Sequence, residues 1–109
     1  MYLSGYRCMW IVAMFDLPTD TRKARRDYTR FRKELLRDGF SQMQYSVYIR
    51  HCASEENALA HAMRVEKTIP SAGEVRIITV TDKQFERMRV FWGKSRLPVE
   101  SPPAQLELF

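Results

Sequence analysis

The chain has 109 residues, a length that supports one domain with a modest core. It carries 18 Lys and Arg against 13 Asp and Glu, which gives a net charge of +5. No window reaches the roughly 18 apolar residues that a membrane-spanning helix needs, and residues 1–7 lack the pattern of a signal peptide. We therefore expect no membrane partner, a cytoplasmic protein, and Cys8 and Cys52 as free thiols.

The first predicted element is a strand that covers the apolar run from Cys8 to Phe15. A run without polar interruption is typical of a central strand buried on both faces. It stops at Asp16, which is followed by Leu17 and Pro18. A carboxylate held at the end of a strand suits Mg²⁺, which binds few carboxylates and keeps several waters. The alternative is that Asp16 only caps the turn at Leu17 and Pro18.

A helix follows, with Asp20 as its predicted N-cap and Gly39 as the left-handed residue after its end. Spacing at about 100° per residue gives this helix one apolar side. That side consists of Ala24, Tyr28, Phe31 and Leu35. The opposite side carries five cations, which are Arg22, Arg26, Arg30, Lys33 and Arg37. We call these five residues the basic stripe, and we expect the helix to dock on a core while the stripe faces outward.

Positive charge is concentrated in this helix, because residues 21–37 hold eight of the 18 basic residues and only two acids. Such a concentration favours a polyanionic partner, either nucleic acid or an anionic membrane surface. Cations at this spacing can follow a phosphate backbone without reading bases. The alternative is a solvated face that Asp27, Glu34 and Asp38 partly balance.

Residues 40–52 alternate as a strand does, but their number predicts a bulge or tight turn near Gln44–Ser46. Ser54 is the predicted N-cap of a second helix, which Pro70 and Gly73 end. Its expected buried stripe consists of Ala58, Leu59, Ala62, Val65 and Ile69. Both histidines, His51 and His61, lack metal-ligand spacing and are expected in surface or capping roles.

The last third of the chain predicts a strand over Val75–Thr81 and a short helix through Phe85 and Met88. Three prolines make Gly93–Pro103 an expected extended connection, and Gln105–Phe109 alternates as an edge strand would. For Phe15, Tyr45 and Tyr48, packing in the core is expected over stacking on bases.

This order of elements predicts an α+β fold, a ferredoxin-like split βαβ sandwich with two helices on one face of an antiparallel sheet. Residues 1–92 form the expected domain, and residues 93–109 form a C-terminal segment with a terminal strand. Because the first strand is apolar on both sides, something must cover the second face of the sheet. Homodimerisation through the sheets is the simplest cover.

Three stretches together resemble a known family. They are Trp10–Pro18 (WIVAMFDLP), Gln44–Tyr48 (QYSVY) and Thr79–Phe85 (TVTDKQF), joined by the arginine-rich helix. They resemble the small CRISPR-associated subunit of spacer acquisition, in the variants found beside a single large effector nuclease. The likeness runs from about Tyr6 to Met88.

The resemblance implies a homodimer whose C-terminal strand crosses onto the partner's sheet, which would give Leu106, Leu108 and Phe109 a purpose. It implies that Asp16 is the catalytic, metal-binding acid, with two copies facing each other across the dimer. Members of the family are Mg²⁺-dependent endonucleases on RNA or DNA. They also scaffold protospacer DNA between dimers of the larger integrase subunit, and their arginines fall near Lys23, Arg25 and Arg26 here.

Two functions follow from these expectations. The scaffold is the expected physiological role, with slow hydrolysis as an intrinsic activity. A non-catalytic ferredoxin-like regulatory or protein-interaction dimer is the alternative. That alternative predicts an affinity for DNA that hardly changes with salt, whereas a scaffold that neutralises phosphates binds less tightly as salt increases.

Overall fold

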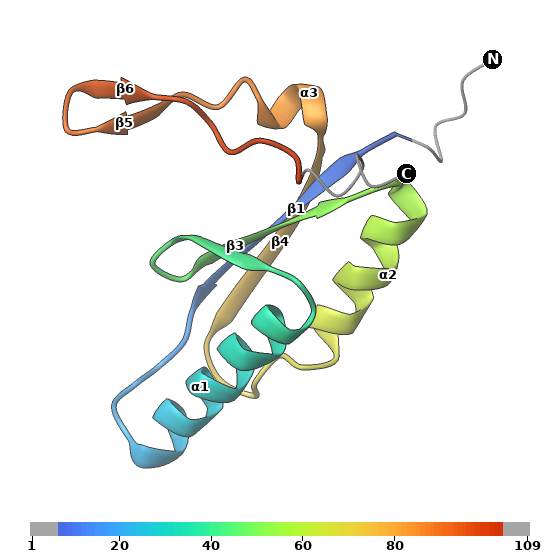
Figure 1. Ribbon diagram of the computed structural model, residues 1–109. Helices are drawn as coiled ribbons and strands as arrows, with labels where there is room; N and C mark the ends of the chain where they lie inside the picture. Colours follow the sequence, from blue (N-terminus) through green and yellow to red (C-terminus); the bar gives the residue numbers. More distant parts are fainter. Residues whose placement is uncertain (1–6, 104–109) are drawn as a thin grey trace.

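The computed structural model describes residues 7–103 and follows the order βαββαβ before a final short helix and hairpin (Figure 1). Its elements are β1 (Met9–Asp16), α1 (Arg22–Arg37), β2 (Ser41–Gln44), β3 (Val47–Cys52), α2 (Glu55–Glu66), β4 (Glu74–Thr81), α3 (Asp82–Phe85), β5 (Val90–Trp92) and β6 (Ser95–Leu97). No helix in this described part of the chain is both long enough and apolar enough to cross a bilayer.

The main sheet has four antiparallel strands in the order β2-β3-β1-β4, with β1 in the interior. Helices α1 and α2 cover one face of it (Figure 1). This is the ferredoxin-like arrangement, so the predicted α+β fold class is confirmed. On the helical side of β1, Ile11 and Ala13 are fully buried, whereas on the second side Trp10 is buried and Val12 and Met14 are half-buried.

The second face of the sheet is partly covered by the chain itself. Trp10 and Ile49 are buried there against Phe85 of α3, and Val99 packs on the same cluster. Toward the Asp16 end no segment of residues 7–103 covers the sheet, since Ile78 in the middle of β4 keeps 50% of its surface exposed. Part of the cover expected for this face is therefore supplied by the same chain, because α3 and residue 99 cover one end.

Helix α1 begins at Arg22, and its N-cap is Thr21 rather than the predicted Asp20. The Thr21 hydroxyl accepts a hydrogen bond from the Ala24 amide at 3.0 Å. Asp and Thr are both good caps, so the neighbouring residues compete and sequence alone does not separate them. The end of the helix matches the prediction, because Gly39 is left-handed with φ of +91°.

The predicted irregularity in residues 40–52 is a two-residue turn at Tyr45 and Ser46 that divides β2 from β3. The register also shifts between Gln42 and Gln44. Ser46 adopts a left-handed φ of 62°, as a residue at a tight hairpin turn does.

In α2, Ser54 is the N-cap as predicted, but the buried stripe differs from the expected one. Leu59 is 61% exposed and Ile69 is 39% exposed, so both assignments to the core were wrong. The helix ends at Glu66, before Pro70, so Ile69 lies outside the helical period. His61 takes an inward position beside Ala58, Ala62 and Val65.

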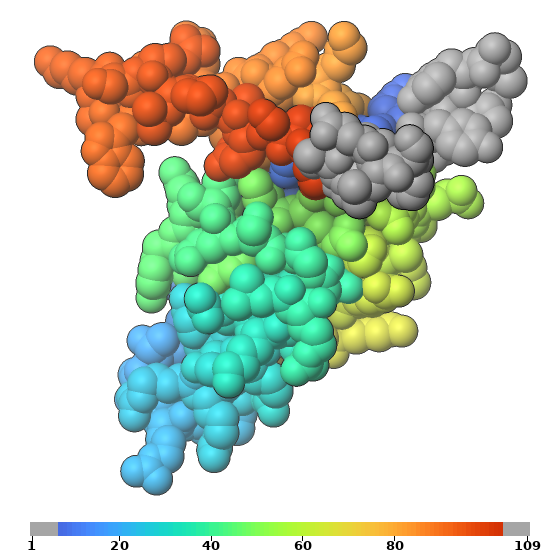
Figure 2. All heavy atoms as spheres, in the orientation of Figure 1, coloured from blue at the N-terminus to red at the C-terminus, as the bar shows by residue number. Residues whose placement is uncertain are grey.

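The chain after α3 is not the predicted extended connection. The short helix ends at Phe85 instead of continuing to Met88, and β5 and β6 form a hairpin that turns at Gly93. The prolines begin only at Pro98, beyond this hairpin, so they do not interrupt it. The hairpin extends away from the sheet (Figures 1 and 2) with Trp92 80% exposed. The predicted strand at 105–109 lies outside the described residues.

Candidate functional site

Asp16 is the exposed last residue of β1 and lies on the sheet face opposite the helices. The preceding residue, Phe15, points to the helical side and is held by three rings. Its ring centroid lies 5.9 Å from that of Tyr28, 5.1 Å from Phe31 and 5.6 Å from Tyr48. Because successive strand residues alternate, this aromatic anchor fixes the Asp16 carboxylate on the open face.

The turn between β2 and β3 supports the same end of β1. The Phe15 amide donates a hydrogen bond to the Ser46 carbonyl at 3.0 Å. The hydroxyls of Ser46 and Tyr28 lie 3.3 Å apart, which ties the turn to α1. Core packing is confirmed for Phe15 and Tyr48, whereas Tyr45 is 78% exposed and the expectation for it was wrong.

A second carboxylate, Glu74, lies opposite Asp16. The two residues are register partners of β1 and β4, so their side chains leave the same face of the sheet. Arg76, two residues along β4, donates to the Glu74 carboxylate at 3.1 Å. This hydrogen bond and the charge of Arg76 lower the pKa of the Glu74 carboxyl. Glu74 was not among the predicted site residues, because the predicted strand began at Val75, one residue after the observed start of β4.

Gly73 lets the chain approach this site closely. Its φ is +95°, and a Cβ atom there would lie 2.8 Å from the Asp16 carbonyl oxygen and 2.7 Å from the Leu17 Cδ2 atom. Both distances are shorter than ordinary contacts, so only glycine fits without movement of the backbone. The Asp16 backbone therefore depends on a glycine from the β4 side of the sheet.

All five residues of the basic stripe are exposed on α1, as predicted. Three further contacts neutralise part of the helix. Asp27 accepts from Lys23 at 2.8 Å and from Arg30 at 2.7 Å, and Glu34 accepts from Arg37 at 2.8 Å. Within residues 7–103, no carboxylate lies within ion-pair distance of the stripe members Arg22, Arg26 and Lys33.

Asp38 does not balance the stripe as the alternative interpretation assumed. Its carboxylate contacts His61 at 2.7 Å and Arg64 at 3.1 Å, both on α2. Arg25, near the start of α1, donates to the Thr19 carbonyl at 3.1 Å. The part of the stripe around Arg22 and Arg26 therefore keeps its positive charge, which is the property that binding to phosphates requires.

The structure does not bring Asp16 and the basic stripe onto one surface of a single chain. The apolar side of α1 packs on the helical face of the sheet through Phe31 and Leu35, so the stripe faces outward from that layer. Asp16 lies on the other side of the sheet. A site for cleavage and a surface for binding a phosphate backbone are therefore separate features of the fold.

With this geometry established, comparison with known proteins decides the family. The model of the family described as "CRISPR associated protein Cas2" matches residues 9–88, more than half of the chain. The chain belongs to this Cas2 family. The match includes Asp16, the whole of α1 and the Gln44–Tyr48 turn, so the resemblance seen in the sequence is confirmed.

Curated Cas2 relatives are similar over nearly their full length. A protein of Parvibaculum lavamentivorans is 60% identical over 101 residues, which cover 93% of this chain and all of the relative. One of Flavobacterium psychrophilum is 50% identical, covering 98% of this chain and 93% of the relative. One of Paracidovorax avenae is 46% identical, covering 98% and 99%. All three are named CRISPR-associated endoribonuclease Cas2.

Both histidines of this Cas2 chain were expected in surface or capping roles, but both are buried and each lies beside a carboxylate. His61 bridges α2 to Asp38 at the end of α1. His51 lies in β3, and its Nε2 atom is 3.2 Å from the Asp82 carboxylate. Their partners lie 23 and 31 residues away along the chain, so no local spacing predicts either pair.

Proposed function

We propose that this chain is a dimeric nucleic-acid-binding subunit of CRISPR spacer acquisition that scaffolds protospacer DNA with the larger integrase subunit. We further propose that it hydrolyses phosphodiester bonds, foremost of RNA, with Mg²⁺ at Asp16. Membership of the Cas2 family and the names of the relatives support the endoribonuclease activity. The observation that carries the catalytic assignment is the exposed Asp16 carboxylate, held by Phe15 and facing Glu74.

The residues around Asp16 fit Mg²⁺. Two carboxylates directly opposite each other in an antiparallel pair repel; Arg76 already offsets part of that repulsion at Glu74, and a cation beside Asp16 would relieve the rest. Carboxylate oxygens are the hard ligands that Mg²⁺ prefers, and one or two of them suffice when waters and phosphate oxygens complete the shell. Asp16 would hold the ion with Glu74 beside it. When bound, Mg²⁺ polarises a phosphate and makes water more acidic.

The chain's own residues position this reaction. Phe15 and the Ser46 carbonyl hold the backbone that carries Asp16, and Arg76 places an exposed cation on the same face for a phosphate oxygen. Both histidines of the chain lie beside other carboxylates, His51 beside Asp82 and His61 beside Asp38. Because neither histidine serves as a general base at Asp16, we expect slow turnover.

A second copy of the chain is the expected cover for the sheet face near Asp16. Val12 and Met14 are half-buried there, and Ile78 is half-exposed. A partner placed on this patch removes the apolar surface from water and brings two Asp16 carboxylates together. In this proposal residues 1–92 form the domain of each protomer, and the terminal strand of the segment 93–109 packs on the partner.

The scaffold role rests on the basic stripe. Arg22, Arg26 and Lys33 retain charge that acids of the described residues do not pair, and they lie on the side of α1 that faces away from the sheet. DNA lying along this surface releases counterions, so affinity falls as salt increases. Since the stripe and Asp16 occupy different sides of the protomer, binding can persist when hydrolysis is lost.

The deciding experiment measures cleavage of end-labelled RNA and DNA by the purified protein and its Asp16→Asn variant, with Mg²⁺ and with chelator. We expect Mg²⁺-dependent cleavage of RNA that the variant loses while it still dimerises and binds DNA. Equal cleavage by both proteins would contradict the catalytic role of Asp16. No cleavage together with salt-dependent DNA binding would leave the scaffold alone.

A specific observation favours the regulatory or protein-interaction dimer as the second candidate. The β5–β6 hairpin exposes Phe91 by 54% and Trp92 by 80%, and aromatic side chains are enriched in protein interfaces. In that case the protein would neither cleave nucleic acid nor bind DNA through the basic stripe. A DNA affinity that is weak and insensitive to salt would support this alternative.

A further inference from the structure

We propose that Cys8, His51 and Asp82 form a second metal site, one for Zn²⁺, at the opposite end of β1 from Asp16. Cys8 directly precedes β1, His51 lies in β3, and Asp82 begins α3. Eight residues separate Cys8 from Asp16, which corresponds to about 26 Å in an extended strand. The site is therefore independent of the proposed hydrolysis and goes beyond it.

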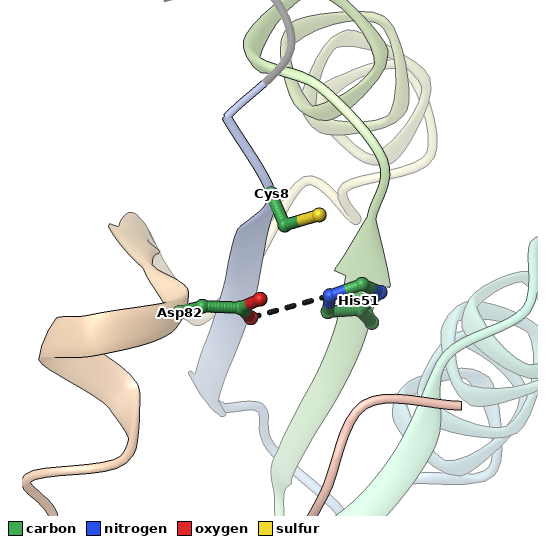
Figure 3. A group of neighbouring side chains, drawn as sticks. All are labelled: Cys8, His51 and Asp82. Atoms are coloured by element: carbon green, nitrogen blue, oxygen red, sulfur yellow. Dashed lines mark ion pairs between the residues drawn. The ribbon is translucent and has the colours of Figure 1, made fainter. Parts of the chain in front are cut away.

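The three side chains converge on one point (Figure 3). Each residue offers one candidate ligand atom, and these three atoms lie within 4.8 Å of one another. They are the Cys8 sulfur, a His51 ring nitrogen and an Asp82 oxygen. The distance between His51 Nε2 and Asp82 Oδ1 is 3.2 Å. Two ligands of a tetrahedral Zn²⁺ with bonds of about 2.1 Å lie roughly 3.4 Å apart. The nitrogen–oxygen pair thus already has nearly the spacing that the ion requires.

The burial of these atoms points to a ligand that they share. The His51 side chain is only 3% exposed. Its Nε2 atom and the Asp82 Oδ1 atom are both buried, and neither forms a hydrogen bond within the described residues despite their short separation. Buried polar atoms are nearly always hydrogen-bonded or bound to an ion. An ion between them satisfies both, because each atom can donate a lone pair to a cation and neither has to supply a hydrogen.

The donor set selects the metal. A thiolate, an imidazole nitrogen and a carboxylate oxygen are all zinc ligands, whereas Mg²⁺ rarely accepts sulfur. The thiolate and the carboxylate supply two negative charges, which neutralise Zn²⁺ in a partly buried position. Next to the three ligands is a hollow lined by Thr81, Gln84 and Arg87 that gives access to Cys8 and Asp82. A water from this hollow can take the fourth position.

Such an ion would join three elements that are distant along the chain. Helix α3 already packs on the sheet, where the rings of Phe85 and Trp10 stack with centroids 4.1 Å apart. A bond from Asp82 to the same ion as Cys8 and His51 would hold the start of α3 against β1 and β3. Because the ion binds only the folded arrangement, Zn²⁺ should raise the unfolding temperature of the whole domain.

The test measures Zn²⁺ binding to the full chain by competition with a chromophoric chelator, and Co²⁺ binding by absorbance. We expect one ion per chain, with a sulfur-to-cobalt charge-transfer band in the near ultraviolet. Cys8→Ser should abolish that band and weaken Zn²⁺ binding by more than about 100-fold, because loss of a direct ligand costs more than the roughly 10- to 100-fold that follows a change in the residues supporting a ligand. His51→Gln should weaken binding to a similar extent.

Matched variants separate this site from the rest of the molecule. Cys52→Ser removes the other thiol, and His61→Gln removes the other buried histidine, and both should retain binding. Asp16→Asn should bind Zn²⁺ normally even if it loses hydrolysis, so the two proposals fail separately. Absence of stoichiometric binding, or binding that Cys8→Ser leaves unchanged, would overturn the zinc site. Cys8 is half-buried and outside the strand, so its variant tests the site even if His51→Gln does not fold.

Discussion

Asp16 and Glu74 face each other as the last pair at the end of the β1–β4 ladder, and Arg76 donates a hydrogen bond to the Glu74 carboxylate. This pair is the reason to expect a cation at the end of β1. If Glu74 assists Asp16, then Glu74→Gln should raise the Mg²⁺ concentration for half-maximal cleavage by about 10-fold, the low end of metal-shell effects. A titration of cleavage against Mg²⁺ measures this.

Glu66→Gln is the matched control for that titration, because Glu66 is an exposed acid at the end of α2. It removes the same charge and should leave the Mg²⁺ requirement unchanged. An identical shift in both variants would show that net charge alone sets the requirement. An unchanged Mg²⁺ requirement in Glu74→Gln would contradict a role for Glu74 and leave Asp16 as the acid that this face contributes to the metal site.

Reversal of charge on the basic stripe should abolish binding to duplex DNA. The triple change Arg22→Glu, Arg26→Glu, Arg30→Glu removes three phosphate contacts, and each contributes about 0.9 to the slope of log affinity against log salt. The unchanged protein, measured from low to moderate salt, should therefore show a slope to which these three residues contribute roughly 2.7, whereas the variant should show no binding while the proposed dimer stays intact.

The control for this reversal is Lys83→Glu, Arg87→Glu, Arg89→Glu, which changes net charge by the same amount at and after α3. All three of these residues are exposed. We expect a smaller loss of affinity in the control, because these cations do not form a stripe on one helix. Equal loss in the two proteins would mean that overall charge, and not the surface of α1, attracts DNA.

Gly73→Ala should destabilise the domain and displace the end of β1. Left-handed backbone at an alanine and a contact of 2.8 Å with the Asp16 carbonyl together cost about 1–3 kcal/mol in the free energy of unfolding. Gly93 also has a positive φ, but no atom of the described residues lies within 4 Å of an added Cβ, so Gly93→Ala should cost only about 1 kcal/mol. Urea unfolding of both variants compares the two costs.

The aromatic anchor under β1 should dominate stability. Phe31 of α1 is fully buried, and its ring packs edge-on against that of Phe15. Phe31→Ala should cost about 3–5 kcal/mol of unfolding free energy. Leu59→Ala removes an apolar side chain that is 61% exposed on α2, and its cost should stay within about 0.5 kcal/mol. Thermal or denaturant unfolding gives both values, and similar costs would contradict the assignment of the core.

The acid side of the pH–stability profile should depend in part on Asp27. The hydrogen bond from Lys23, followed by the charges of Lys23, Arg30 and Arg26, lowers the pKa of the Asp27 carboxyl. A lowered folded-state pKa stabilises the fold above the unfolded value of about 3.9, and this contribution is lost as the pH falls through the folded value.

Asp27→Asn should therefore be less stable than the unchanged protein at neutral pH, and the difference should disappear in acid. Urea unfolding at several pH values measures the difference. Asp20→Asn, which removes an exposed carboxyl without an ion pair in the described part of the chain, is the control. A difference for Asp27→Asn that persists at the lowest pH would show that its effect is not electrostatic.

Local patterns predicted most of the regular structure. The apolar run of β1, the two sides of α1, the left-handed Gly39 and the capping box of Thr81 and Gln84 all depend on residues close together in the chain. The prediction was wrong where two neighbouring residues could both cap a helix, as Asp20 and Thr21 can. It was also wrong where later prolines were given more weight than a glycine that favours a turn. The chain turns at Gly93 between β5 and β6, although three later prolines favoured an extended segment.

The candidate sites also contain parts that local sequence predicts and parts that only the tertiary structure reveals. Sequence alone determined that Asp16 closes a buried strand and that α1 carries a cationic side, because burial and helical period are properties of contiguous residues. Only the tertiary structure decided that Glu74 faces Asp16, and that Cys8, His51 and Asp82 meet around one point. Sheet register and helix packing bring together residues that are tens of positions apart, and no local pattern records which partners they will have.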